Sequence, residues 1–549
     1  MVLLSQTKVA SGDNLTKVIG NYSSPSDSLK KKAAAFLIEN IQPHFSYHSK
    51  EWTLFCSALN SISSYDSETY HTKYDSIFKK YQYRLYDYKV AYDKDTLTSK
   101  FLANNIDEAF ELYKLPQCEK LPFDFFCEYI LPYRIGNEQL VNWRKKFYKD
   151  FYPVYSKFYT NYSDSLSALN FCDSIKKLFD IKVQYHYAIP DFDPFTLSNL
   201  KEGTCNEFSS LIAFICRSYG IPVAVDFVPQ WGKKKGGHEW NALLSPDKKP
   251  LDFGIGDMFK PGNHLKANLL WVAPKIYRRI YSVNKQCLAF INKDEEIPDL
   301  FLDSCLKDVT SEYYKTYDLT IKLLQSSPKP TEFAYLAVFD NRNWIPVQWG
   351  KIENTSVVFK EMNKGLVYLP VYYKNGAVAP AAYPVQLKDS DKIYELKPNT
   401  DIKQTLILKR KYNNANPMIY DRRLNNSKFQ VANKQDFSDA VDIYIIKNSW
   451  DNNYQTVYST DTVNNYKYFR YFIPKGSGAE MAELEVYDIN GQRINGKIFG
   501  GEGGGNFPAY EKLFDNKVLT YMKVGRTYDT WAGLEFDKSE KIKKIVYLP

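Results

Sequence analysis

Apolar residues recur at different spacings in different parts of this chain. From about residue 26 to residue 159 they return every three or four positions, as in Asp27–Ile38 and Ile106–Leu112, which predicts amphipathic helices. From about residue 164 a helix is mixed with short alternating runs, which are typical of strands. We therefore predict a helical N-terminal domain over residues 1–163 and a mixed α+β core over residues 164–293.

The second half of the chain shows mainly the two-residue alternation of strands. Phe333–Phe339 and Ala482–Tyr487 are examples, and the glycine-rich run Gly500–Gly505 reads as a flexible loop between strands. Two β-sandwiches are predicted, over residues 294–425 and 426–549. Because 549 residues are too many for one core, the fold class expected is multidomain α+β.

Composition and charge narrow the possible partners. A hydrophobic fraction of 44% with 16% aromatic residues indicates a chain that is folded almost throughout. The formal charge of +9 is spread along the sequence, so we expect no nucleic-acid partner. No apolar run approaches the ~18 residues that span a bilayer, so no transmembrane segment is predicted.

The eight cysteines do not form a metal-binding pattern. None is paired at the close spacing of structural zinc sites, so we expect no metal and no cofactor. Their even number permits disulfides, yet buried free thiols are equally compatible with a chain of this length. The sequence leaves the redox state of the cysteines open.

The segment Gly203–Phe208 predicts a helix that begins at a cysteine. Thr204 followed three residues later by Glu207 is a capping box, which places Cys205 at the first helical position. A thiol there lies near unpaired main-chain N–H groups and the positive end of the helix dipole, so we expect the thiolate to be favoured. Its own N–H is suited to stabilise an oxyanion. We predict Cys205 as a nucleophile and Cys216, on the apolar helix face, as a structural cysteine.

Two strands predicted after this helix carry a histidine and an aspartate. If the turn between them is the tripeptide Ser245–Asp247, His238 and Asp252 share a face as diagonal neighbours within side-chain reach. A turn with an even number of residues would separate them. In the predicted chemistry His238 accepts the thiol proton and Asp252 fixes the imidazole. Asp226 and Asp257 are alternatives for this third role.

Three segments of this region resemble the transglutaminase-like superfamily, in particular its multidomain members from Bacteroides-type bacteria. They are Gly203–Cys205, Val225–Gly232 and Gly237–Leu243. The resemblance implies a papain-like core, with the cysteine on a helix and the histidine and aspartate on adjoining strands. It also implies export to the periplasm or cell surface, often as a lipoprotein, with the export signal absent from this sequence.

The same resemblance implies the composition of the site. Cys205, His238 and Asp252 would form the catalytic triad. Trp231 and Trp240, which lie in or beside the resembling segments, are candidate substrate-binding residues of the core. The expected substrates are peptides, proteins or glycopeptides.

Near the C-terminus, the segments Phe514–Lys517 and Tyr528–Phe536 resemble discoidin-like (galactose-binding-like) β-sandwiches. Such modules often bind glycans through exposed aromatic side chains in loops. Tyr528 and Trp531 are therefore the candidate glycan-binding residues, with core packing as the alternative for each.

These features predict acyl transfer through a Cys205 thioester, with hydrolysis of peptide or glycopeptide amides favoured. A cross-linking transglutaminase would use the same acyl-enzyme with an amine as acceptor. A non-catalytic surface scaffold that binds glycan or protein is the third alternative. Because no cysteine follows Cys305 and no histidine follows His264, we expect residues 164–293 to catalyse alone and the second half to recruit substrate.

Overall fold

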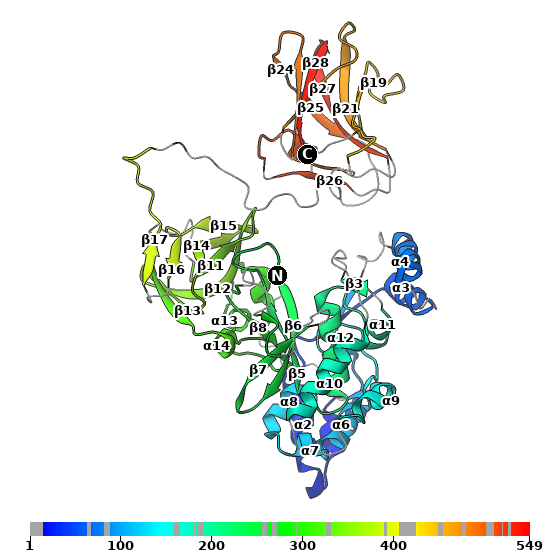
Figure 1. Ribbon diagram of the computed structural model, residues 1–549, viewed down its shortest axis with the longest axis vertical. Coiled ribbons are helices and arrows are strands. Elements are labelled where there is room, and N and C mark those ends of the chain that lie inside the picture. The colour runs from blue at the N-terminus through cyan, green and yellow to red at the C-terminus, as the bar shows by residue number, and fades with distance from the viewer. Residues whose placement is uncertain are drawn as a thin grey trace. The chain divides into compact units, whose positions relative to one another are not determined.

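The computed structural model forms two compact units, Met1–Asn399 and Thr400–Pro549 (Figure 1). Among the described helices, none is long and apolar enough to cross a membrane. The structure describes residues 15–62, 67–81, 88–158, 165–179, 182–183, 190–200, 202–254, 261–265, 272–292, 294–324, 331–388, 392–403, 405, 424–447, 454–474, 479–500, 510–518, 520–524 and 529–549.

The N-terminal region is helical, as its periodicity predicts. It also contains a short antiparallel pair, β1 (Phe45–His48) with β2 (Lys89–Tyr92), that the periodicity does not predict. The helices are α1 (Thr16–Gly20), α2 (Ser28–Glu39), α3 (Lys50–Asn60), α4 (Ser67–Tyr81), α5 (Asp93–Thr96), α6 (Ser99–Tyr113), α7 (Pro116–Glu119), α8 (Phe123–Tyr129) and α9 (Arg144–Tyr155).

The following region contains helices and an antiparallel sheet. The helices are α10 (Ser165–Leu178), α11 (Pro194–Asn199) and α12 (Cys205–Arg217), with a short parallel pair of β3 (Lys182–Val183) and β4 (Glu202–Gly203). The sheet has the order β7-β6-β5-β8-β9. Its strands are β5 (Val223–Val228), β6 (His238–Ser245), β7 (Lys248–Phe253), β8 (Tyr277–Arg279) and β9 (Leu306–Asp308).

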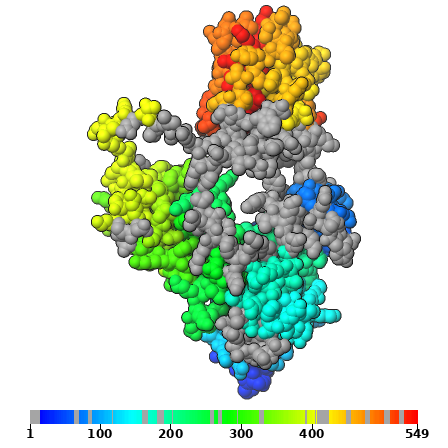
Figure 2. Space-filling model, viewed as in Figure 1, coloured from blue at the N-terminus to red at the C-terminus, as the bar shows by residue number. Residues whose placement is uncertain are grey.

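Helix α12 covers one face of this sheet. Val225 and Leu243 on the strands share a core with Phe208 and Leu211 of the helix, and the side chain of Asn241 donates to the main-chain oxygen of Ser209 at 2.8 Å. The same core includes side chains of α3, α9 and α10. A single core therefore extends across the domain boundary predicted at residue 163, because helices from both sides of it are needed to cover this face. On the surface, the cyan and green parts of the first unit lie side by side (Figure 2).

The predicted end of the catalytic core at residue 293 is also wrong. Strand β9 lies beyond it and pairs with β8, with Tyr277 opposite Asp308. Tyr313, in the short helix α14 (Thr310–Tyr313), donates its hydroxyl to the buried carboxylate of Asp226 at 2.6 Å. The sheet needs these later residues to complete its edge and to cover the face that α12 leaves open.

A second, larger sheet follows in the same unit. In Figure 1 it lies on the side of β5–β8 opposite to helix α12. Both faces of its central strand β11 are buried, one around Leu336 and the other, with Tyr335, against Tyr277 of β8. Its order is β10-β13-β12-β11-β14-β16-β17, with β15 paired to β14. Its strands are β10 (Tyr317–Lys322), β11 (Phe333–Phe339), β12 (Trp344–Glu353), β13 (Ser356–Met362), β14 (Val367–Lys374), β15 (Ala377–Pro380), β16 (Val385–Leu387) and β17 (Ile393–Glu395).

The second unit contains two sheets around a common core, with orders β19-β18-β21-β27-β25 and β20-β28-β23-β24. This is a β-sandwich, and the predicted strand at Ala482–Tyr487 is β23. The strands are β18 (Lys428–Ala432), β19 (Val441–Ile445), β20 (Gln455–Tyr458), β21 (Tyr466–Ile473), β23 (Glu483–Asp488), β24 (Arg493–Ile494), β25 (Gly496–Gly500), β27 (Thr530–Glu540) and β28 (Ile542–Leu548), with an added pair of β22 (Ala479–Met481) and β26 (Met522–Val524).

Candidate active site

Cys205 occupies the first position of α12, as the capping box predicts. The carboxylate of Glu207 accepts the main-chain N–H of Thr204 at 2.5 Å, and the Thr204 side chain in turn accepts the main-chain N–H of Glu207, the third helical residue. Gly203 is required for this close packing, because a Cβ there would lie 2.7 Å from the Glu207 carboxylate and 2.8 Å from the Phe208 ring. The helix start is therefore fixed by local interactions that the sequence encodes directly.

The thiol of Cys205 does not have the lowered pKa that the helix terminus alone predicts. Burial raises its pKa, and the nearby Glu239 carboxylate raises it further. Main-chain N–H groups, including those of Glu239 and Asn206, point at the sulfur and oppose this shift without reversing it. The prediction that the thiolate is favoured at rest is therefore wrong, and the cysteine needs a base to become a nucleophile.

Glu239 itself is paired. Its carboxylate accepts from the Arg279 guanidinium at 2.9 Å. This pair links β6 to β8 beside the sulfur. It also means that the negative charge near Cys205 is partly balanced by Arg279.

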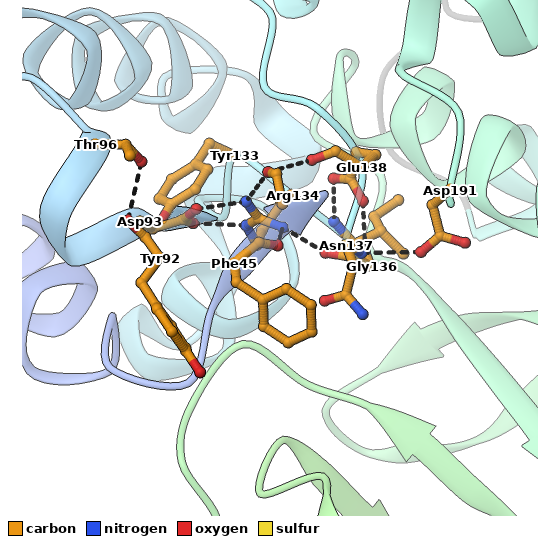
Figure 3. A network of polar contacts seen from close by, with 12 residues as sticks. Phe45, Tyr92, Asp93, Thr96, Tyr133, Arg134, Gly136, Asn137, Glu138 and Asp191 are labelled. Atoms are coloured by element: carbon orange, nitrogen blue, oxygen red, sulfur yellow. Dashed lines mark hydrogen bonds and ion pairs between the residues drawn. The ribbon is translucent and has the colours of Figure 1, made fainter. Parts of the chain in front are cut away.

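A buried network of polar contacts lies around Arg134 in the N-terminal region (Figure 3). The Arg134 guanidinium, in the segment after α8, donates to both carboxylate oxygens of Asp93, at 2.7 and 2.6 Å. It also donates to the main-chain oxygens of Phe45 and Gly136. Asp93 additionally accepts the Tyr133 hydroxyl. With so many bonds to main-chain and charged groups, Arg134 fixes the conformation of the segment that follows it.

That segment is linked through Asp191 to Asn206, the residue after Cys205. Asp191 accepts the main-chain N–H of Asn137 at 2.9 Å, as Figure 3 shows. The other oxygen of the same carboxylate accepts the Asn206 side chain at 3.1 Å. Asn206 follows Cys205 directly, so Asp191 connects the helical N-terminal region to the start of α12.

His238 begins β6, and its Nε2 atom lies 2.9 Å from Nε2 of His264. The ring lies on the face of β6 opposite to the face that α12 covers, because Asn241 points to the helix and side chains alternate. Cys205 approaches this strand at the main-chain N–H of Glu239, one residue after His238. The structure thus brings the thiol and the histidine to the same end of β6.

Trp231 and Trp240, predicted to bind substrate, are both fully buried, with 0% of their surfaces exposed. Their rings lie about the two histidines: the Trp231 and Trp240 centroids are 6.2 and 6.1 Å from that of His238. Neither indole is exposed to a substrate in this structure, which does not support the predicted substrate contact. The two tryptophans instead form the apolar walls around the imidazole pair.

Asp252 shares a face with His238, but it is not the predicted diagonal neighbour. The turn contains only Pro246 and Asp247, an even number that would place the two side chains on opposite faces. An irregularity in the β6–β7 pairing after Leu243 shifts the register by one residue, so Asp252 still lies on the same face as His238. Asp252 consequently lies opposite Ala242, four residues or roughly 14 Å along the strand from His238. Its carboxylate accepts the main-chain N–H of Leu265 at 2.7 Å.

The two alternatives for the third role differ in what the structure shows. Asp226 is buried and receives two hydrogen bonds from the Arg278 guanidinium, at 2.7 and 2.8 Å, besides the one from Tyr313. These bonds bind it firmly as a structural ion pair. Asp257 lies outside the described residues.

His264 is a site residue that sequence reasoning missed. It is 4% exposed and belongs to the segment of residues 261–265, which follows β7. Its imidazole packs against Gly254, where a Cβ would lie 3.0 Å from the ring carbon Cε1. The sequence around it has no periodicity or motif that marks it, since the contact depends on the return of the chain to β6.

A large cavity lies elsewhere in the first unit. It has a volume of about 1860 Å³ and is lined by residues of β8, β9, β12 and β13, including Cys287, but not by Cys205 or His238. Within the described ranges, no three His, Cys, Asp or Glu side chains lie close enough to hold a metal ion.

The predicted glycan-binding residues of the second unit can be compared only in part, because Tyr528 lies outside the described residues. Trp531 is partly exposed and lies in strand β27 instead of a loop. Its ring contacts Phe437 and Phe499 at centroid distances of 5.2 and 5.0 Å. The Arg470 guanidinium lies 5.5 Å from the centroid of the same ring.

Comparison with known proteins assigns a class to the region that carries this site. Residues 162–250 match the family model described as the transglutaminase-like superfamily. This match covers α12, β5 and β6, and with them Cys205 and His238. The chain thus contains a transglutaminase-like region, a class whose members are usually cysteine enzymes. A search of curated proteins finds no match to the chain.

Proposed function

We propose that this chain is a cysteine-dependent acyl-transfer enzyme that hydrolyses amide bonds of peptides or glycopeptides. Cys205 is the nucleophile and His238 is the general base. The observation that carries the proposal is the position of Cys205 at the capped start of α12, with its sulfur beside the main-chain N–H of Glu239, the residue after His238. The transglutaminase-like region contains all three residues.

In the proposed reaction, His238 takes the proton of the Cys205 thiol, and the sulfur attacks the carbonyl carbon of the amide. The C–N bond breaks, and the amine leaves with the proton from His238. Water then attacks the thioester and releases the acid and the thiol. Because burial raises the pKa of the thiol, the proton transfer to His238 is an essential part of the first step.

The helix start also offers stabilisation for the oxyanion. The main-chain N–H of a first helical residue has no intrahelical acceptor, and Cys205 is at that position. An oxyanion formed on a carbonyl attacked by the sulfur develops close to this N–H. Such a donor typically contributes about 100-fold or more to the rate.

The experiment that tests the proposal uses an electrophilic thiol probe followed by peptide and glycopeptide libraries. Of the eight cysteines, only Cys205 and Cys287 are not buried, so Cys287→Ala is the matched control for Cys205→Ala. We expect probe labelling and turnover to be lost in Cys205→Ala and retained in Cys287→Ala. Turnover that survives in Cys205→Ala would exclude this nucleophile.

The same libraries distinguish the two possible acceptors of the acyl group, water and an amine. Release of a free acid indicates hydrolysis, whereas incorporation of a labelled amine indicates a cross-linking transglutaminase. Labelling of Cys205 without any turnover in the libraries would favour the non-catalytic scaffold. We further propose action in the periplasm or at the cell surface, which cell fractionation tests directly.

We also propose that the second unit recruits a glycan through Trp531. The partly exposed indole lies among aromatic rings with a guanidinium close by, and both groups suit sugar binding. A glycan array with the wild type and Trp531→Ala tests this proposal. Equal binding by the two proteins would refute it.

A further inference from the structure

We propose that His264 is a positioning residue that holds the imidazole of His238 in its catalytic orientation. The inference rests on the proposed function, in which His238 is the base. It starts from the distance of 2.9 Å between the two Nε2 atoms. This is an ordinary hydrogen-bond length, and both rings sit among buried groups.

A hydrogen bond between two neutral imidazoles fixes a tautomer. One Nε2 must carry the proton and the other must accept it. When His238 is the donor, its basic nitrogen is Nδ1, and this is the atom that takes the thiol proton. The imidazolium then carries protons on both nitrogens, and its Nε2–H still donates to His264. The bond is therefore preserved through the proton transfer, which is what an orienting group must provide.

His264 is itself held in place by β7 and the residue after it. Gly254 allows the ring to lie against the main chain, because a side chain there would meet Cε1 at 3.0 Å and Nδ1 at 3.3 Å. Asp252 accepts the N–H of Leu265, the residue after His264, at 2.7 Å. Asp252 thus acts on the segment that contains His264, which it anchors, and not on the imidazole of His238 as predicted.

The surroundings strengthen this bond. Trp231 and Trp240 are fully buried and flank the pair, and the Trp240 indole is itself fixed by a hydrogen bond of 3.2 Å to the Tyr313 hydroxyl. Away from water, a hydrogen bond between side chains is stronger and its partners have fewer alternative conformations. The tryptophans that do not reach substrate therefore have a role in the site.

The test measures carbamidomethylation of Cys205 by iodoacetamide, followed by mass spectrometry of the full chain between about pH 5 and pH 9. The variants are His264→Ala, His264→Gln and His238→Ala, with His71→Ala on helix α4 as the control. A glutamine carboxamide places a polar atom near the position of Nε2, so it can keep the bond. At neutral pH we expect His264→Ala to slow labelling about tenfold, toward the rate of His238→Ala. We expect His264→Gln and His71→Ala to stay within about threefold of the wild type.

The outcomes separate the two levels of the argument. If His238→Ala slows labelling and His264→Ala does not, the inference is overturned and the proposed base remains. The inference is also overturned if His264→Gln is as slow as His264→Ala. If His238→Ala labels like the wild type over the whole pH range, His238 is not the base, and both fail together. Should His264→Ala not fold, Gly254→Ala replaces it, because its methyl group displaces the imidazole and should slow labelling in the same direction.

Discussion

Removing everything after residue 293 should unfold the sheet β7-β6-β5-β8-β9. Such a chain loses β9, whose three residues pair with β8, and it loses α14. It also loses the strands that cover Tyr277 from the other side. The truncation therefore opens the sheet at its edge and uncovers the face that carries His238.

The size of the effect follows from the side chains that become exposed. Tyr277, Leu288, Ile276 and Trp240 are all buried and all pack against residues beyond 293. At about 1.5–3 kcal/mol for each fully exposed side chain, and roughly half of that for partial exposure, the loss is about 3–6 kcal/mol. The lost Tyr313 bond to the charged Asp226 adds about 1.5–3 kcal/mol. The total rivals the typical stability of a domain, about 5–15 kcal/mol.

The assay compares chains ending at residues 293 and 399 by urea unfolding, monitored by circular dichroism. The longer chain, which contains the whole first unit, should unfold cooperatively. The shorter one should show a much lower midpoint or no cooperative transition. A shorter chain that unfolds at the same urea concentration, with the same Cys205 labelling rate, would refute the reasoning and restore a catalytic core that ends near residue 293.

Two further substitutions test the electrostatics of the site. Burial raises the pKa of Glu207 to about 7, so its stabilising contribution is complete below the unfolded pKa and is lost as pH rises through about 7. The free energy of unfolding of the wild type relative to Glu207→Gln should fall by up to about 3 kcal/mol over this window, and a difference independent of pH would contradict it. Asp226→Asn should cost about 1.5–3 kcal/mol in urea unfolding, because it removes the buried carboxylate charge beside Arg278 and leaves that guanidinium paired with Glu312 alone, at 2.8 Å, whereas the exposed Asp247→Asn should be neutral. A loss below about 1 kcal/mol for Asp226→Asn would show that the ion pair with Glu312 is enough to balance Arg278.

Where a feature depends on neighbouring residues, the sequence predicts it well. The start of α12 at Cys205 follows from Thr204 and Glu207, because a capping box is made within four residues. The buried face of the helix follows from its periodicity and includes Cys216, which is fully buried as expected of a structural cysteine.

Features that depend on tertiary contacts were not predictable in the same way. The three-residue turn predicted for the β6–β7 hairpin is wrong, because the turn closes over two residues. His238 and Asp252 share a face only because an irregularity shifts the pairing, and Asp252 lies farther along the strand than predicted. The raised pKa of Cys205 comes from burial and from Glu239, which lies 34 positions away in the sequence. His264 contacts His238 from 26 positions away in the sequence, and no local sequence pattern predicts this contact.

The position of Cys205 depends on more of the chain than the transglutaminase-like region. Asn206, beside Cys205, is held by Asp191, and the same carboxylate holds the main chain at Asn137. Asn137 is in turn placed by the segment that the buried Arg134 fixes. Because residue 137 precedes the matched residues 162–250, the N-terminal region helps to fix the start of α12. A separate docking domain would leave the start of α12 without this support, so the fold argues for one structural unit in which the helical region helps to set the position of Cys205.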